Sequence, residues 1–198
     1  MIDQREFILA LKFAAHSMAK NDVRHYLNGI LMEFNNSGIS LTASDGHRLA
    51  KIDLIFDHEL SGSHILSGEN VSQILKIFPY NSKIDSQILI EIKGGKIHFS
   101  NFDMYGQGAS ICCGLIDGKY PDADRLIKEH IAKEDKPGAA VNPLYLEEAC
   151  KASKFIGSRF NAAKITSKGT ENSLLLEFTS RLGCMDGNAL VLIMCMRT

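Results

Sequence analysis

The chain repeats one order of elements three times, and this repetition limits its possible folds more than any other feature. Each copy starts with a helix-capping residue and an amphipathic helix pattern, and strand-like segments joined by turns follow. The copies begin at Asp3, Ser67 and Asn142, which gives units of roughly 60 residues. A unit of this kind has an unfinished apolar face and must pack on its neighbours. The repetition therefore predicts an α+β fold of helices packed on antiparallel strands.

Local signals place the elements within each copy. Asp3 followed by Glu6 has the spacing of a capping box and predicts a first helix over about residues 4 to 18. The second helix is predicted to end at Pro79, and the third has Pro143 at its first position. Strand character is found at residues 27–34, 38–44, 47–56, 86–93, 96–100, 106–116, 162–167, 173–179 and 189–196.

One segment between the second and third copies has the composition of a linker. Residues 121–140 are first charged and then rich in Gly and Ala, and we expect them to connect two domains. Asp122 and Asp124 within this segment have a D-x-D spacing that could suit a hard cation. The sequence offers no third carboxylate at a suitable spacing, so Asp122 is better interpreted as a helix cap beside Pro121 and no metal site is predicted.

Composition excludes several classes of protein. Lys and Arg number 22 against 23 Asp and Glu, so no global positive charge indicates nucleic acid or an acidic membrane. No apolar run approaches the roughly 20 residues of a membrane span, and the charged start does not resemble a signal peptide, so we expect a cytoplasmic protein. The five cysteines are odd in number and lack C-x-x-C spacing, which indicates reduced, mostly buried side chains rather than disulfides or zinc ligands.

Four motifs carry a resemblance to a known family. Residues 22–34 (DVRHYLNGILMEF), 43–50 (ASDGHRLA), 117–127 (DGKYPDADRLI) and 193–198 (IMCMRT) resemble, in the same order, signatures of the bacterial DNA polymerase III beta subunit, the sliding clamp. The resemblance implies the DNA-clamp fold. Residues 1–127 would correspond to the family's middle domain, with two units, and residues 128–198 to the second half of its last domain. It also implies that the first domain, half of the last domain and the strand before the first helix are absent.

The resemblance implies a protein that binds DNA without catalysis and without a cofactor. Clamp rings encircle duplex DNA, with helices lining the hole, and basic side chains meet phosphates weakly enough to permit sliding. The residues expected to contact DNA are Arg24, His25, Tyr26, Lys12, Lys20, Lys76, Lys151 and Lys154.

The same resemblance implies a groove for the short hydrophobic motifs of DNA polymerase and the clamp loader. Leu and Met side chains suit a deformable apolar pocket, and a glycine permits close approach of the backbone. Cys195 and Thr198 stand where the family usually has proline and leucine. The expected groove residues are Leu27, Ser44, Gly46, His47, Arg48, Leu49, Pro121, Arg125, Leu126, Leu192, Met194, Met196 and Arg197.

Two alternatives concern the turn at residues 44–48. Ser44, Asp45 and His47 could form a hydrolytic site, but consecutive turn residues rarely place a serine, a base and an oxyanion site together. The turn could also be only a connection between strands. The groove interpretation is preferred because the turn lies within a family motif.

The number of units raises the question of assembly. A clamp ring contains twelve such units, so four chains with three units each could form a homotetrameric ring in which the third unit completes a domain with a neighbouring chain. The alternative is a chain that does not encircle DNA and acts as a decoy or regulator by binding clamp motifs.

Overall fold

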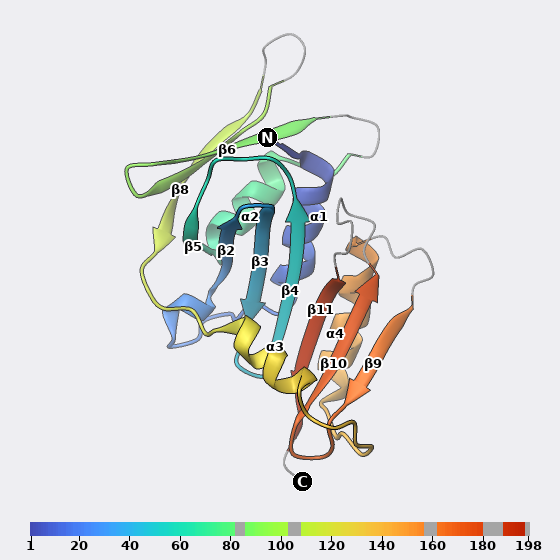
Figure 1. The fold of residues 1–198 in the computed structure, drawn as a ribbon. Helices are drawn as coiled ribbons and strands as arrows, with labels where there is room; N and C mark the ends of the chain where they lie inside the picture. Colours follow the sequence, from blue (N-terminus) through green and yellow to red (C-terminus); the bar gives the residue numbers. More distant parts are fainter. Residues whose placement is uncertain (82–85, 103–107, 157–161, 180–187, 197–198) are drawn as a thin grey trace.

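A single twisted antiparallel sheet runs through the whole computed structural model (Figure 1). The structure describes residues 1–81, 86–102, 108–156, 162–179 and 188–196. The order of strands across the sheet is β1-β6-β7-β8-β5-β2-β3-β4-β11-β10-β9. The strands are β1 (Ile2–Asp3), β2 (Gly29–Asn35), β3 (Gly38–Ser44), β4 (Arg48–Ile55), β5 (Gly62–Ser67), β6 (Gln87–Lys93), β7 (Lys96–Ser100), β8 (Ser110–Ile116), β9 (Ala163–Ser167), β10 (Ser173–Thr179) and β11 (Asn188–Met194).

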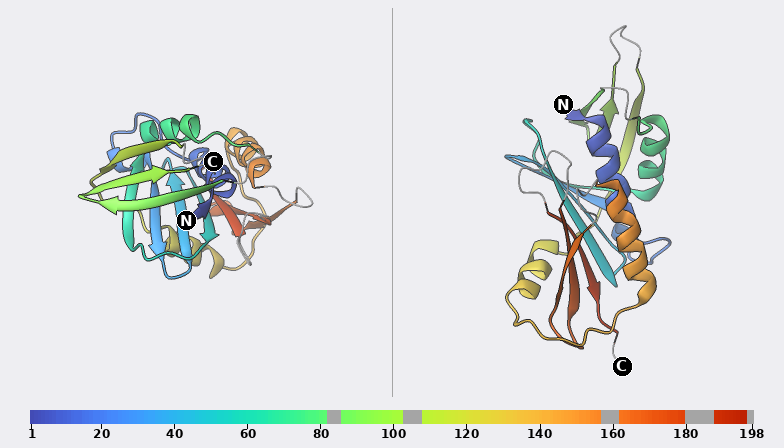
Figure 2. Two further views of the ribbon diagram at one scale, coloured as in Figure 1. Left: turned by 90° about the horizontal axis from the view of Figure 1, so that it is seen from above. Right: turned by 90° about the vertical axis from the view of Figure 1, so that its right-hand side faces the viewer.

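The helices divide between the two faces of this sheet (Figure 2). Helices α1 (Gln4–Ala15), α2 (Gly68–Ile77) and α4 (Pro143–Ala152), one from each unit, lie on one face. Helix α3 (Ala123–Ile131) lies on the opposite face, which we call the outer face. Two short 3-10 helices, η1 (His25–Leu27) and η2 (Ser153–Phe155), follow α1 and α4.

The capping residues act as their sequence positions predict. The side chain of Asp3 accepts a hydrogen bond from the backbone N–H of Glu6, and Ser67 accepts one from Asn70. Asn142 accepts one from Leu144 at the start of α4. These bonds satisfy N–H groups that the first turn of a helix leaves without partners, which explains why each helix begins there.

Four features of the elements differ from the sequence expectations. A two-residue strand, β1, does precede α1 and pairs Ile2 with Ile88 of β6. The segment expected to be a linker contains α3. The interpretation of Asp122 as a helix cap is confirmed, because its side chain accepts a hydrogen bond from the Arg125 N–H. Strand β5 was not predicted, because Ser67 was interpreted only as the cap of the next helix. The first helix is also shorter than predicted and ends at Ala15.

The third unit packs on its own chain. Strand β11 pairs antiparallel with β4, and one hydrophobic core contains side chains of all three units. The rings of Phe13 in α1 and Phe178 in β10 meet edge to face, with centroids 6.2 Å apart. The boundary predicted near residue 127 is therefore crossed by a continuous sheet and a shared core.

The exposure of the described cysteines differs from the expectation that they are mostly buried. Cys112 and Cys150 are exposed, contrary to the expectation of burial, whereas Cys113 is buried; Cys184 lies outside the described residues. Burial raises the pKa of the Cys113 thiol to about 11, because a thiolate is disfavoured away from water. Among the described residues, no helix is both long enough and apolar enough to cross a membrane.

Thiol labelling checks this difference. At pH 8 an alkylating reagent should modify Cys112 and Cys150 within minutes, while Cys113 should react only after denaturant is added, because thiolate content and access control the rate. Peptide mapping by mass spectrometry identifies the sites. Equal labelling of Cys112 and its neighbour Cys113 in the native protein would contradict the placement of β8.

Candidate functional site

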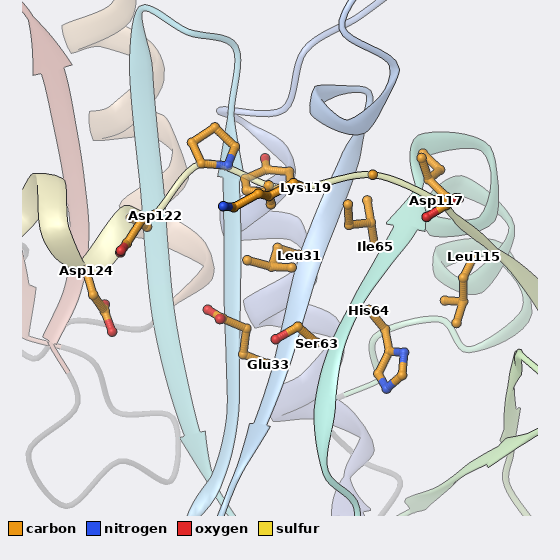
Figure 3. Close-up of a pocket in the computed structure, with 15 residues that line it drawn as sticks. Leu31, Glu33, Ser63, His64, Ile65, Leu115, Asp117, Lys119, Asp122 and Asp124 are labelled. Atoms are coloured by element: carbon orange, nitrogen blue, oxygen red, sulfur yellow. The ribbon is translucent and has the colours of Figure 1, made fainter.

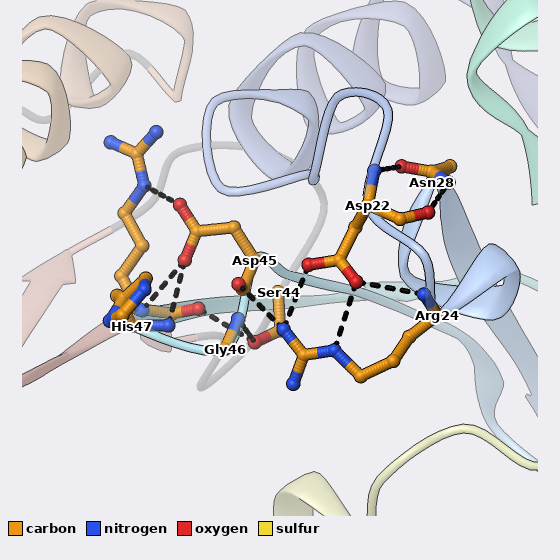
Figure 4. Close-up of polar contacts among 8 residues, drawn as sticks. Asp22, Arg24, Asn28, Ser44, Asp45, Gly46 and His47 are labelled. Atoms are coloured by element: carbon orange, nitrogen blue, oxygen red, sulfur yellow. Dashed lines mark hydrogen bonds and ion pairs between the residues drawn. The ribbon is translucent and has the colours of Figure 1, made fainter.

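The turn between β3 and β4 is closed by its own polar groups (Figure 4). One carboxylate oxygen of Asp45 accepts from the backbone N–H groups of His47 and Arg48, at 2.9 and 3.0 Å. The Ser44 hydroxyl donates to the Arg48 carbonyl at 2.7 Å and accepts from the Gly46 N–H at 3.1 Å. The His47 ring stacks on the ring of Tyr145, with centroids 6.1 Å apart. The serine and histidine are thus engaged separately, and the turn does not have the geometry of a hydrolytic site.

A small cavity opens beside this turn, and we call it the motif pocket. Its volume is about 190 Å³, and its walls come from η1, the turn, β4, β11 and the segment that leads into α3. The pocket exists because β11 pairs with β4, which places Leu192 opposite Leu49. The lining residues are Arg24, Leu27, Ser44, Gly46, Arg48, Leu49, Pro121, Leu126, Leu192 and Met194.

Most of the groove residues expected from the sequence line this cavity, and three others that the structure describes do not. His47 lies against Tyr145, and Arg125 is paired with Glu129 on the exposed side of α3, at 3.2 Å. Met196 is 55% exposed, and its N–H donates to the Ala140 carbonyl. Arg197 lies outside the described residues.

Helix α3 forms its wall of the pocket by packing on the outer face of the sheet. Ala123 and Ile127 are buried against Leu49, Leu175 and Leu192. Burial of such side chains removes apolar surface from water and stabilises the helix there. A segment that looks like a linker by composition is therefore a structural part of the site.

Tyr120 fixes the position of this wall and was missed by the sequence analysis. Its hydroxyl accepts from the Ser44 N–H at 2.8 Å and donates to the Gly29 carbonyl at 3.4 Å. Burial raises the pKa of the Tyr120 phenol well above its usual range. The sequence did place Tyr120 within the motif at residues 117–127. Its hydrogen-bond partners, however, lie far away in the chain, so its role could not be predicted.

Arg24 lines the motif pocket, and its side chain is half-exposed. Its guanidinium donates to both carboxylate oxygens of Asp22, at 3.0 and 2.8 Å, and reaches the Asp45 carbonyl at 3.4 Å (Figure 4). The bonds from Arg24 lower the pKa of Asp22 to about 2. Gly46 has a φ of 88°, and a Cβ there would lie 2.7 Å from an Arg24 nitrogen. The positive φ favours glycine at this position, and the absence of a side chain lets the Arg24 guanidinium approach the turn closely.

Arg48 joins the first and third units. Its side chain is 10% exposed and forms ion pairs with Asp45, at 3.0 Å, and with Glu148 of α4. The Arg48 guanidinium also lies over the Tyr145 ring, 4.8 Å from its centroid, which is the geometry of a cation–π contact. In the free chain the Arg48 guanidinium is therefore already held by contacts with the turn and with the third unit. Tyr145 and Glu148 were missed, since nothing near them in sequence indicates this contact.

The residues expected to contact DNA are spread over the helix-covered face and its margin. Lys76 of α2 and Lys154 of η2 are exposed, as is Lys20 after α1. Lys151 is paired with Glu147 at 2.6 Å. Lys12 lies about 6 Å from the centroids of two aromatic rings, those of Tyr80 and Phe155.

Two residues of the expected DNA loop lie in η1. His25 is exposed, while the Tyr26 ring packs edge to face on Tyr120, with centroids 6.4 Å apart. A concave region of about 1000 Å³ lies between the helices and includes Lys12, Lys20 and Glu148 in its lining. The helix-covered face is therefore of mixed charge.

The described residues contain no group of three or more His, Cys, Asp or Glu side chains placed to hold a metal ion. Asp122 caps α3, and Asp124 forms an ion pair with Lys51. Both carboxylates of the D-x-D sequence thus have structural partners.

Comparison with known proteins gives one consistent result. A family model described as DNA polymerase III beta subunit, central domain, matches residues 1–122. The beta sliding clamp of Proteus mirabilis is 29% identical over 160 residues, covering 79% of this chain and 42% of that protein. The beta sliding clamp of Haemophilus influenzae is 27% identical over 175 residues, covering 85% of this chain and 45% of that protein. This chain thus spans less than half the length of these curated relatives.

Solved structures agree on the fold. The DNA polymerase sliding clamp of Pseudomonas aeruginosa superimposes on the whole chain with a TM-score of 0.74 at 18% identity, over 66% of that protein. The sliding clamp of Bacillus subtilis gives the same score at 17% identity, over 63% of its chain. The predicted α+β clamp fold is confirmed, and the match over residues 1–122 shows that the chain belongs to the DNA polymerase III beta subunit family.

Proposed function

We propose that this chain is a non-catalytic DNA sliding clamp, a processivity factor that encircles duplex DNA and tethers DNA polymerase and the clamp loader. The motif pocket is the observation that carries the proposal. It brings together side chains from all four motifs that resemble the family, although these motifs lie far apart in the sequence.

The pocket suits a short hydrophobic segment of a partner. Leu27, Leu126 and Met194 present apolar surface, and methionine can adapt its shape to different side chains. Gly46 adds no side chain that would narrow the pocket. Partners would then bind mainly through one or two apolar anchors, as short peptides do in other grooves.

The helix-covered face suits loose contact with a duplex. Exposed Lys20, Lys76 and Lys154 can meet phosphates through solvent, and the nearby carboxylates limit the total attraction. Weak, sequence-independent contacts allow a ring to slide, while the closed ring itself prevents dissociation.

Free sheet edges support a homo-oligomeric ring. At one end of the sheet β9 has no further strand among the described residues, and its Ile165 is 57% exposed. At the other end β1 pairs only with residues 87–88 of β6, and the rest of that edge has no strand partner within the part of the chain that the structure describes. Unpaired edges favour pairing with another chain. Because the third unit is docked on its own chain, we propose that four chains pair head to tail, with the β9 edge of one meeting the β6 edge of the next.

Sedimentation followed by retention on nicked circular DNA tests the proposal. We expect a tetramer at micromolar concentration that stays on the circle and is released when the circle is cut, because encirclement is topological. Ile165→Asp should lower retention to background by placing a charge at the edge, whereas Ile55→Asp, at an exposed position of β4, should not.

Two results would overturn the ring. A monomer with no retention on circles would do so, as would a complex that remains bound equally after linearisation. A monomer that still binds clamp motifs would favour the alternative, a regulator that does not encircle DNA.

A further inference from the structure

A second groove lies on the outer face of the sheet, beside the segment that leads into α3 (Figure 3). Its volume is about 490 Å³. Figure 3 shows the segment of residues 117–124 running across β2 and β5, with Leu31, Glu33 and Ile65 beside it. We call this cavity the outer groove. Pro121 lines both cavities, so they are neighbours along the same segment.

The floor of the outer groove is apolar. Leu31 and Ile65 stand opposite each other on β2 and β5, and both belong to a small buried cluster with Tyr120. Ile116, which is half-buried and packs on this cluster, extends the surface towards β8. The floor offers room for one apolar side chain of a bound segment.

The rim of the groove is mainly acidic. Glu33, Asp117, Asp122 and Asp124 line it, and Lys119 is the one Lys or Arg side chain in the lining. Asp124 is paired with Lys51, and Asp122 caps α3, so these two carboxylates are held in place by the fold.

Glu33 is the carboxylate that would gain most from a cation. It is half-buried on the outer face of β2, and its carboxylate is hydrogen-bonded to the Ser63 hydroxyl. Burial raises the pKa of Glu33, and the charges of Asp124 and Asp122 raise it further, while Lys51 lowers it. An incoming ammonium or guanidinium group would stabilise the charged form of Glu33 and so offset the effects of burial and of the two aspartates.

We infer that the outer groove binds a basic segment, carrying lysine or arginine beside an apolar residue, that flanks the hydrophobic motif of a partner protein. The inference rests on the proposed function of the motif pocket. Three observations support it: the acidic rim would complement a basic segment, the floor of the groove is apolar, and Pro121 lines both cavities. Charged contacts at the edge of an interface typically guide association and add specificity rather than supply most of the affinity.

Three fluorescent peptides test the inference. Each carries the same leucine-containing motif and a flank of three lysines, three glutamines or three glutamates, prepared with the flank at either end. On the wild-type protein at low salt, the lysine flank should bind roughly two- to fivefold more tightly than the glutamine flank, and the glutamate flank more weakly than both. High salt should reduce these differences.

Two variants that change the charge of the outer groove in opposite directions serve as matched controls. Glu33→Gln keeps the shape and the contact with Ser63 and should remove most of the preference for the lysine flank. Lys119→Gln removes the competing cation and should increase that preference about twofold. Neither residue lines the motif pocket, so the glutamine-flank peptide should bind both variants as it binds the wild type.

The outcomes separate the two proposals. Equal affinities for the three flanks, with normal binding of the motif, would overturn the inference and leave the proposed function standing. A preference for lysine that persists in Glu33→Gln would also overturn it, since the cation would be recognised elsewhere. Failure of every peptide to bind would overturn both the motif pocket and the outer groove.

Discussion

Replacing Phe178 with alanine should lower the free energy of unfolding by about 3 to 5 kcal/mol, the usual cost of removing a buried phenylalanine ring. Phe178 lies on β10 in the third unit and is 3% exposed. Its ring meets Phe13 of the first unit edge to face, at an interplanar angle of 80°. The loss should therefore destabilise the whole chain rather than the third unit alone. Urea unfolding followed by circular dichroism and by fluorescence measures the change.

A double-mutant cycle shows whether the units share one core. Phe13→Ala and Phe178→Ala should each destabilise the protein, and their effects should differ from additivity by about 0.5 to 1.5 kcal/mol because the two rings are in contact. Thr179→Ala, at an exposed position of the same strand, should change stability by less than about 0.5 kcal/mol. Two separate unfolding transitions, with strictly additive effects, would indicate independent domains.

Replacing Met194 with aspartate should weaken the binding of a clamp-motif peptide by about 30-fold or more. Met194 lines the motif pocket and is 41% exposed in the free chain. A bound peptide would cover its position, so the substitution removes an apolar contact and buries a carboxylate without a partner, at a cost of about 2 to 3 kcal/mol. Isothermal titration or fluorescence anisotropy measures the loss.

The control for this variant lies on α3. Ile131→Asp changes an isoleucine that is 60% exposed and is absent from the lining of the motif pocket, and it should bind the peptide as the wild type does. Both variants should keep the unfolding midpoint of the parent protein within a few degrees, because both sites face solvent. Undiminished binding by Met194→Asp would mean that peptides bind elsewhere.

The sequence was sufficient where structure depends on nearby residues. The caps at Asp3, Ser67 and Asn142 form hydrogen bonds within three residues of themselves, and the expected starts of the helices are correct. Most strands were found for the same reason, since alternation of apolar side chains is a local pattern. The four motifs led to the family, and most of the groove residues expected from that resemblance gather around one cavity.

Both errors arose because the elements were predicted from nearby residues alone. The charged segment of residues 121–140 looked like a linker because the apolar residues of α3 are few, yet Ala123 and Ile127 find buried positions on the sheet. β5 was missed because its last residue, Ser67, was assigned only to the cap of α2. In both segments the partner that stabilises the element lies elsewhere in the chain.

The sequence by itself determined the repeated units, the helix starts and the residues that resemble a clamp. Only the tertiary structure decided where the third unit sits and how the site is held together. The Tyr120 hydroxyl bonds the Ser44 N–H across 76 residues of sequence, and Arg48 meets Glu148 across 100. The physical reason is that capping bonds and hydrophobic periodicity act over a few residues, whereas these contacts exist only after β11 has paired with β4 and α3 has packed on the outer face.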